Sequence, residues 1–170
     1  MRHALLVMLA LLAAGCSSQI AGAPAAPAVA DASQVDMCTI LTDPELMGLG
    51  IELNSREPVN RLGLVGCGWL GTRYTLDLER DKDTVAQYQA RRHDPAFTSF
   101  ADNTVNGRTG ARLSVDRDHS DCTQLIDGGA VSLTVSVSPA GLYTGPKIDS
   151  CAEALRIAQM IEPRLPKAGS

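Results

Sequence analysis

The sequence predicts an α+β domain with two layers, in which helices pack on one face of an antiparallel β-sheet and two disulfides hold the chain. Three observations support this class. Stretches of alternating apolar and polar residues predict strands that are joined by short turns. The domain ends in an amphipathic helical pattern. Five cysteines occur in the chain, and four remain in the domain when the N-terminal Cys16 is set aside.

The N-terminus has the pattern of an export signal. Apolar residues fill positions 4–14 after Arg2, about half of the roughly 20 that a membrane-spanning helix needs. The run ends in Ala13-Ala14-Gly15-Cys16, which resembles the bacterial lipobox. The resemblance implies that diacylglycerol is joined to the Cys16 thiol, that the chain is cut before Cys16, and that the new amine is open to acylation. Two or three acyl chains hold a protein on a bilayer. An ordinary secreted protein with an incidental cysteine is the alternative.

These features divide the chain into four parts. We expect a signal peptide at 1–15, the lipidated cysteine with a flexible Ala/Pro/Ser-rich tether at 16–34, one globular domain at 35–166, and a tail at 167–170. The expected location is the outer, extracytoplasmic face of the cell membrane, through the lipid anchor. The net charge of −4 becomes −5 when Arg2 leaves with the signal, which argues against nucleic acid as a partner.

The first half of the domain predicts short helices and a hairpin. Segment 35–50 reads as two helical pieces, the first capped by Asp36 and the second by a capping box of Thr42 and Glu45. Segment 66–80 reads as a hairpin that has a buried face of Tyr74, Leu76 and Leu78 and a wet face of Thr75, Asp77 and Glu79.

The rest of the domain continues this order of elements. Segment 81–95 predicts a surface helix that is capped by Asp83 or Asp81 and ended by Pro95. Segment 103–118 predicts two strands around an Asn-Gly turn. Segment 122–139 predicts two further strands. In the second, hydroxyl residues alternate with Val131, Leu133, Val135 and Val137. The last helix, Ser150–Glu162, carries a capping-box spacing at Ser150 and Glu153 and an apolar face of Cys151, Ala154, Leu155, Ala158 and Ile161.

The four domain cysteines predict two disulfides, because an even count in an exported domain is typical of a disulfide framework. Zinc is the rival, but the chain has no CxxC pair and no clustered histidines. The sequence leaves three pairings open. We favour Cys38–Cys67 and Cys122–Cys151, the pairs nearest in sequence, each closing a loop of about 30 residues that is worth roughly 3–4 kcal/mol.

An ordered set of short motifs resembles a known family. The set comprises Cys38-Thr-Ile-Leu, Leu49-Gly50, Cys67-Gly-Trp69, Val105-Asn-Gly107-Arg-Thr-Gly-Ala111, Cys122, Asp149-Ser-Cys151-Ala-Glu-Ala154 and Leu165-Pro166. It is similar to the small actinobacterial cell-envelope lipoproteins of a domain-of-unknown-function family, which includes mycobacterial LprB-type proteins. The resemblance covers nearly the whole mature domain. It implies location and lineage, and it supplies no catalytic residues.

The loop Asp116–Asp121, which also contains His119 and Ser120, is the polar cluster that most suggests a catalytic or metal site. A calcium loop of the EF-hand type that starts at Asp116 would need Gly and Glu where the chain has Asp121 and Asp127. The G-x-S-x-G motif of a nucleophile elbow is absent from the sequence. We therefore expect a solvated loop, no catalytic residue, no metal ligand and no cofactor.

The predicted function is that of a membrane-anchored lipoprotein of the cell envelope that binds a partner protein or an amphipathic molecule and is not an enzyme. The alternative is an envelope hydrolase or a metal site that uses the Asp116–Asp121 loop with His119. A purely structural role is a third reading. The ligand, the oligomeric state and the pathway stay open at this stage.

Overall fold

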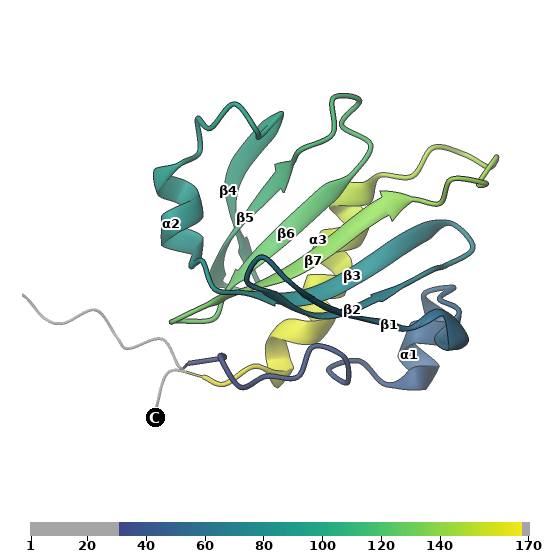
Figure 1. Cartoon of the computed structure of the whole chain (residues 1–170), viewed down its shortest axis with the longest axis horizontal. Helices are drawn as coiled ribbons and strands as arrows, with labels where there is room; N and C mark the ends of the chain where they lie inside the picture. The colour runs from purple at the N-terminus through teal and green to yellow at the C-terminus, as the bar shows by residue number, and fades with distance from the viewer. Residues whose placement is uncertain (1–30, 168–170) are drawn as a thin grey trace, which may run out of the picture.

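A β-sheet of seven strands forms the middle of the protein (Figure 1). The computed structural model describes residues 31–167. The strands are β1 (Glu57–Arg61), β2 (Leu64–Trp69), β3 (Tyr74–Asp81), β4 (Ser99–Val105), β5 (Arg108–Ser114), β6 (Cys122–Asp127) and β7 (Ser132–Pro139). Their order across the sheet is β1-β2-β3-β7-β6-β5-β4, and all neighbours are antiparallel. The predicted α+β class with an antiparallel sheet is confirmed.

Three α-helices accompany the sheet: α1 (Asp43–Gly48), α2 (Val85–Ala90) and α3 (Ser150–Ile161), with 3-10 turns η1 (Leu53–Ser55) and η2 (Glu162–Arg164). The capping box of α1 is confirmed, since the Glu45 carboxylate accepts a hydrogen bond from the backbone N–H of Thr42 at 2.8 Å. The other helical piece predicted in segment 35–50 is wrong. Residues 37–39 form a single turn, in which Asp36 accepts hydrogen bonds from the Cys38 amide and the Thr39 hydroxyl.

Two predicted helix caps are wrong, and in each the residue next to a predicted one forms the cap. Thr84, not Asp83 or Asp81, caps α2, because its hydroxyl accepts from the Gln87 amide at 3.2 Å and the Gln87 side chain accepts from the Thr84 amide. Asp149 caps α3 by accepting from the Ala152 amide at 3.0 Å. In each case a neighbouring residue offered an equally good oxygen, so the residue types alone did not decide the cap.

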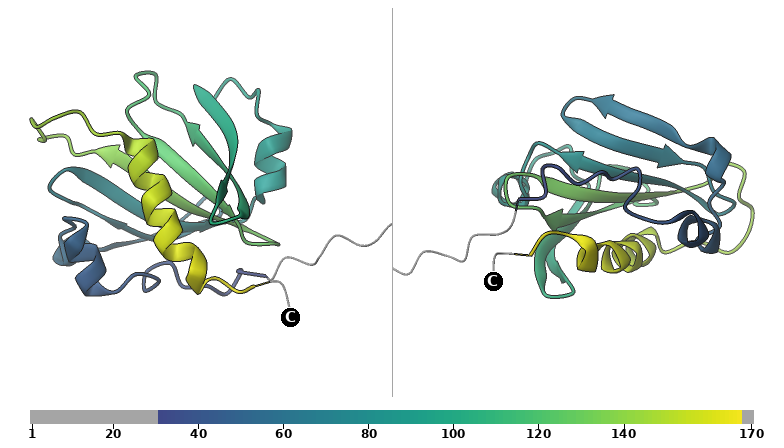
Figure 2. Two further views of the ribbon diagram at one scale, coloured as in Figure 1. Left: turned by 180° about the vertical axis from the view of Figure 1, so that it is seen from behind. Right: turned by 90° about the horizontal axis from the view of Figure 1, so that it is seen from below.

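The sheet has two chemically different faces. α3 and α1 share one buried cluster with the aliphatic face, on which Leu76, Leu78, Leu133, Val135 and Val137 all point toward Ala154, Ile157, Ala158 and Ile161 of α3. α2 lies on the opposite face, where Val85 packs with Ala111, Leu113 and Leu125 (Figures 1 and 2). The expectation that all helices pack on one face is therefore corrected for α2. The physical reason is that Leu125 and Ile126 are both fully buried, and consecutive strand residues must point to opposite faces.

Both favoured disulfides are confirmed. Cys38 bonds Cys67, which ties the N-terminal segment to β2, and Cys122 bonds Cys151, which ties the start of α3 to β6. Each bond spans 29 positions of sequence and holds its Cα atoms 5.0 Å apart.

The structure also contains elements that the sequence did not predict. β1 is an edge strand with mostly exposed side chains and a proline, so it lacks the alternation that marks a strand. Leu62 and Gly63, with φ of 54° and 94°, join it to β2. Packing begins before the predicted domain boundary, because Ala32 is fully buried and its amide donates to the Gly128 carbonyl at 2.8 Å.

The expected signal peptide, the lipobox and most of the tether lie outside the described residues. No helix within residues 31–167 is long and apolar enough to cross a membrane.

The packing of α3 makes a direct prediction. Ala158 is fully buried against the sheet, so Ala158→Glu would bury a charge without a partner and should lower the free energy of unfolding by several kcal/mol, on the order of 3 or more. Gln159→Glu, on the exposed side of the same turn, should change it by less than about 0.5 kcal/mol. Urea unfolding of the full chain measures both. Equal stability of the two variants would show that α3 does not pack as described.

Candidate functional site

The face of the sheet opposite α3, here called the polar face, carries a row of carboxylates on β3. Asp77, Glu79 and Asp81 alternate with the aliphatic residues of that strand and so share this face. The hydroxyl residues of β7 stand beside them, with Ser136 paired to Asp77 and Thr134 to Glu79. On the other side, β2 places glycines next to the same two carboxylates, Gly68 beside Asp77 and Gly66 beside Glu79.

The absence of a side chain at Gly68 leaves an open groove between β1 and β3. With no side chain on β2 to fill the space, the side chains of the flanking strands enclose a hollow of about 540 Å³. We call it the β1–β3 groove; it is lined by Ser55, Glu57, Pro58, Val59, Asn60, Arg61, Gly68, Trp69, Leu70, Thr75 and Asp77. A Cβ atom at Gly68 would lie 2.5 Å from Oδ1 of Asp77, so this carboxylate occupies the space directly over the glycine.

Glu79 follows two residues after the lining Asp77 on the same face, does not itself line the groove, and is the most unusual side chain of the polar face. It is only 5% exposed, and its Oε1 atom has no hydrogen-bond partner in the described protein. The other oxygen, Oε2, has a long 3.5 Å contact with the Thr134 hydroxyl. Burial, and then the negative charge of Asp77, raise the pKa of Glu79 above its ordinary value, while Arg61 opposes the change. The expected wet face is therefore wrong at Glu79.

Asp77 and Asp81 differ from Glu79 in their surroundings. Asp77 is half-buried, and burial raises the pKa of its carboxyl group, with Arg61 again acting in the opposite direction. Asp81 is buried but satisfied, since it accepts hydrogen bonds from the Tyr88 hydroxyl of α2 and from the Asp83 amide. α2 thus satisfies one end of the acidic row, and Asp77 at the other end lines the groove.

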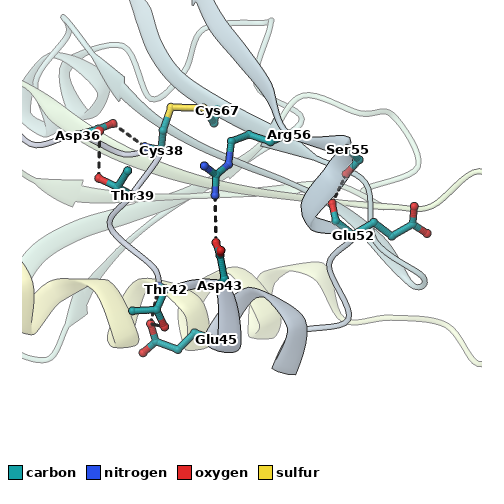
Figure 3. A network of polar contacts seen from close by, with 10 residues as sticks. All are labelled: Asp36, Cys38, Thr39, Thr42, Asp43, Glu45, Glu52, Ser55, Arg56 and Cys67. Carbon is teal, nitrogen blue, oxygen red and sulfur yellow. Dashed lines mark hydrogen bonds and ion pairs between the residues drawn. A yellow bond between two sulfur atoms is a disulfide. The ribbon is translucent and has the colours of Figure 1, made fainter.

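The end of the groove near α1 is held by a polar network (Figure 3). The Ser55 hydroxyl donates to the Glu52 carbonyl at 2.6 Å and accepts from the Leu70 amide at 2.8 Å, which joins η1 to the end of β2. The Arg56 guanidinium pairs with Asp43 at 3.3 Å and lies 5.5 Å from the centre of the Trp69 ring. The Cys38–Cys67 disulfide lies near Arg56 in Figure 3 and joins β2 to the N-terminal segment on the core face of the sheet.

Trp69 contributes a second unpaired polar atom. Its side chain lies in the main core on the face of α3 and is 3% exposed, and its indole Nε1, which can only donate, has no acceptor among the described residues. In the described part of the chain, Trp69 Nε1 and Glu79 Oε1 are the buried side-chain polar atoms without a partner. Buried polar atoms are nearly always paired, so the unpaired oxygen of Glu79, two residues from the lining Asp77 on the polar face, marks this region as the candidate site.

A comparison with models of known protein families shows which family the chain belongs to. The model of a family described as a protein of unknown function, DUF3558, matches residues 11–164. The chain belongs to the DUF3558 family. No curated protein and no solved structure matches it. Membership confirms the resemblance to a family of unknown function; it brings no chemistry to the site, so the geometry of this DUF3558 protein must carry the functional argument.

The Asp116–Asp121 loop does not join the groove. Asp116 accepts a hydrogen bond from the Ser120 hydroxyl, which lowers the pKa of the Asp116 carboxyl, and Asp121 accepts from the Ser114 hydroxyl and the Asp116 amide. His119 is exposed with a φ of 49°, and no side-chain hydrogen bond links it to Ser120 in the described residues. The Ser120 hydroxyl thus donates to Asp116 and not to His119, so the serine–histidine pair that the hydrolase alternative needs is not formed in the described residues.

The remaining predicted site residues are accounted for as follows. Cys16 lies outside the described residues, and the four domain cysteines are consumed in disulfides. Within residues 31–167, no group of three or more His, Cys, Asp or Glu side chains is arranged to hold a metal ion. The groove itself was missed. The available signal was the alternation Gly66-Cys67-Gly68 facing an Asp-x-Glu strand, which predicts a shallow trough beside two carboxylates.

The close packing around Gly66 and Gly68 of this DUF3558 protein can be tested by two alanine variants that should differ in their cost to stability. A Cβ at Gly66 would lie 2.0 Å from the Leu78 carbonyl oxygen, which cannot move away, so Gly66→Ala should cost about 1–3 kcal/mol of stability. Gly68→Ala should cost less because the obstacle is a side chain. Gly48→Ala, with no atom within 4 Å, is the control. Chemical unfolding measures all three, and a Gly66→Ala protein as stable as the control would contradict the close approach of β2 and β3.

Because Glu79 is buried, the stability of the wild-type protein should depend on pH, and Glu79→Gln should be the more stable protein at neutral pH. Its raised pKa means that the folded state holds the proton more tightly, so stability is lost as the pH rises from near 4.5 through the folded pKa. Glu79→Gln cannot ionise and should be more stable than the wild type at pH 7 by about 1–2 kcal/mol. The two proteins should converge near pH 4.

Urea unfolding at the two pH values measures this difference. Glu57→Gln, which changes an exposed carboxyl group of β1, is the matched control and should show little change at either pH. If Glu79→Gln proves less stable than the wild type at pH 7, then the carboxylate has a partner that stabilises its charge.

Proposed function

We propose that this DUF3558 protein is a non-catalytic binding protein of the cell envelope. In this proposal a lipid on Cys16 holds it at the outer face of the membrane, and the β1–β3 groove receives a small ligand. The observation that carries the proposal is the groove itself, a hollow of about 540 Å³ on the polar face that is lined by Asp77, the neighbour of the buried Glu79 on β3. Its volume falls within the roughly 300–1,000 Å³ that is usual for small-molecule sites.

The energetics of Glu79 support a binding role over a purely structural one. A buried carboxylate oxygen without a partner costs stability, and a sheet needs no such group to fold. Thr134, paired with it across the strands, would pack equally well against a neutral residue. Sites that sacrifice stability in this way are typically functional.

The surroundings of the Asp116–Asp121 loop support the absence of catalysis. Its carboxylates accept hydrogen bonds from Ser114 and Ser120 and from amides of the same loop, as a structural turn does. No observation favours the hydrolase alternative, because His119 makes no hydrogen bond to Ser120 in the described chain.

The extracytoplasmic location is supported by two independent features. The sequence before residue 31 has a signal-like apolar run and a lipobox that ends at Cys16. The domain carries two disulfides, which persist in oxidising compartments and are rare in the cytosol. The resemblance to mycobacterial LprB-type lipoproteins supports an actinobacterial origin and the same location.

The anchor has a simple test. Cys16→Ala should release the protein from the membrane fraction or block its processing, because the thiol that would carry the lipid is gone. Cys67→Ala is a matched control, since it removes a cysteine that is buried in a disulfide and leaves the anchor intact. Fractionation with immunoblotting measures both. A Cys16→Ala protein that is cut to mature size and stays in the membrane would contradict the anchor.

The binding role is tested on the full chain. We expect that mass spectrometry of the protein, purified in mild detergent, will detect a co-purified small molecule, and that Gly68→Leu, which fills the groove, will lose it. Gly48→Leu, at an exposed position with no atom near its Cβ, should retain it. Retention by Gly68→Leu, or no small molecule on the wild-type protein, would contradict the proposed function.

A further inference from the structure

We propose that the turn between β1 and β2 is a membrane-contact site, at which Leu62 enters the head-group region of an anionic bilayer. This inference rests on the lipid anchor of the proposed function and adds the way in which the domain meets the membrane that holds it.

Leu62 is both exposed and held in a disfavoured backbone conformation. It is 91% exposed, so it contributes almost nothing to the packing of the domain. Its φ of 54° lies in the left-handed region, which is disfavoured for a residue with a bulky side chain and in which asparagine, aspartate or glycine is usual. A leucine at this position therefore costs stability and gains no burial within residues 31–167.

A second turn of the same kind shows what the fold alone favours. β4 and β5 are also joined by two residues with positive φ, Asn106 at 50° and Gly107 at 88°. The Asn106 side chain donates to the Gln159 carbonyl at 2.9 Å, so this turn residue is bonded to the rest of the domain. Leu62 takes the equivalent position with an apolar side chain. The comparison points to an apolar partner outside the domain.

Two cations flank the exposed leucine. Arg61 precedes it at the end of β1, and Lys82, whose amide donates to the Gly63 carbonyl at 3.2 Å, lies across the turn. Both are exposed, and neither forms a salt bridge within the described chain. The charge of Arg61 also acts on the Asp77 carboxyl, which leaves Lys82 as the main cation of the turn.

This combination of side chains matches the surface of an anionic bilayer. Basic residues are attracted to the head groups, while an apolar residue between them can enter the boundary with the acyl chains. The chain as a whole has a net charge of −4, so an anionic membrane repels most of its surface and favours approach through a basic turn.

The segment that leads to the anchor leaves the domain at the same end of the sheet. The Ser33 carbonyl accepts a hydrogen bond from Arg80 near the end of β3, and the Ala32 amide donates to Gly128 between β6 and β7. The β1–β2 turn lies at this end as well, because β2 begins beside the end of β3 (Figure 1). Cys16 precedes the first described residue by fifteen positions, a span of at most about 50 Å. A lipid on Cys16 therefore keeps this end of the domain nearer the bilayer on average.

The lipid makes a weak contact at Leu62 sufficient. A single apolar side chain binds a membrane only weakly, but the tether converts this contact into an intramolecular one with a high effective concentration. The contact then orients the domain, while the lipid holds it. The β1–β3 groove, which Arg61 also lines, is thereby held beside the membrane surface.

Fluorescence quenching tests the contact in the acylated full chain, reconstituted in vesicles of phosphatidylcholine and phosphatidylglycerol whose acyl chains carry bromine. With Leu62→Trp, the introduced tryptophan should lose at least about half of its fluorescence relative to vesicles without bromine, because its ring reaches the acyl boundary. Leu142→Trp is the matched control and should lose little, since Leu142 is 97% exposed in the loop after β7 at the opposite end of the sheet. The wild-type protein gives the background, because its single tryptophan, Trp69, is 3% exposed.

Two results would overturn the inference. Equal quenching at the two positions would show that the domain has no preferred orientation, and an absence of quenching with Leu62→Trp would show that the partner of the turn is not lipid. Vesicles of phosphatidylcholine alone, and Lys82→Gln combined with Leu62→Trp, should each reduce the quenching, because both remove the attraction between cation and head group. Unchanged quenching in both would contradict the choice of an anionic bilayer.

Leu62→Asn tests the premise separately, since it introduces the residue that such turns favour. The midpoint of urea unfolding should stay the same or rise. A lower midpoint would mean that Leu62 serves the fold, which would also overturn the inference. Fractionation of Cys16→Ala tests the anchor by itself, so an anchored protein whose turn is not quenched contradicts this inference alone and leaves the proposed function standing.

Discussion

A β-strand points successive side chains to opposite faces, and β3 obeys this constraint with two different chemistries. Leu76 and Leu78 must face α3 to complete the main core, so Asp77 and Glu79 must face the other side of the sheet. Neither carboxylate can leave that face without moving a leucine out of the core. The position of the acidic pair is therefore a consequence of the same packing that stabilises the fold.

The glycines of β2 lower the stability of that strand, and the Cys38–Cys67 disulfide offsets the loss. Gly68 leaves the groove open and Gly66 lets β3 approach closely, but glycine in a strand weakens it through lost packing and greater chain entropy. Cys67 lies between them, points to the core face and bonds Cys38. The strand that contributes least packing on the polar face is thus held covalently on the other. An edge strand, β1, can then pair with it and form the outer wall of the groove.

Features that depend on the local residue pattern were predicted from the sequence, whereas features that depend on the packing of distant segments were missed. The alternation in β3 and β7, the Asn106-Gly107 turn and the nearest-neighbour disulfides all follow from residue order, and the structure contains them. β1 carried no alternation, and only its pairing with β2 makes it a strand. The burial of Glu79 likewise could not be read from β3 alone, since it depends on which residues of β2 and β7 stand beside it. The caps of α2 and α3 moved by one residue because adjacent side chains offered the same chemistry.

The central claim is that the folded domain buries the carboxyl group of Glu79 on the polar face without a hydrogen-bond partner for Oε1. The most direct measurement is a carbon-13 NMR titration of the Glu side-chain carboxyl groups in the full chain, with Glu79→Gln to assign the signal. We expect the Glu79 carboxyl to titrate above its ordinary value of 4.5, because burial disfavours the charged form. A Glu79 carboxyl that titrates at or below the ordinary value would contradict the claim.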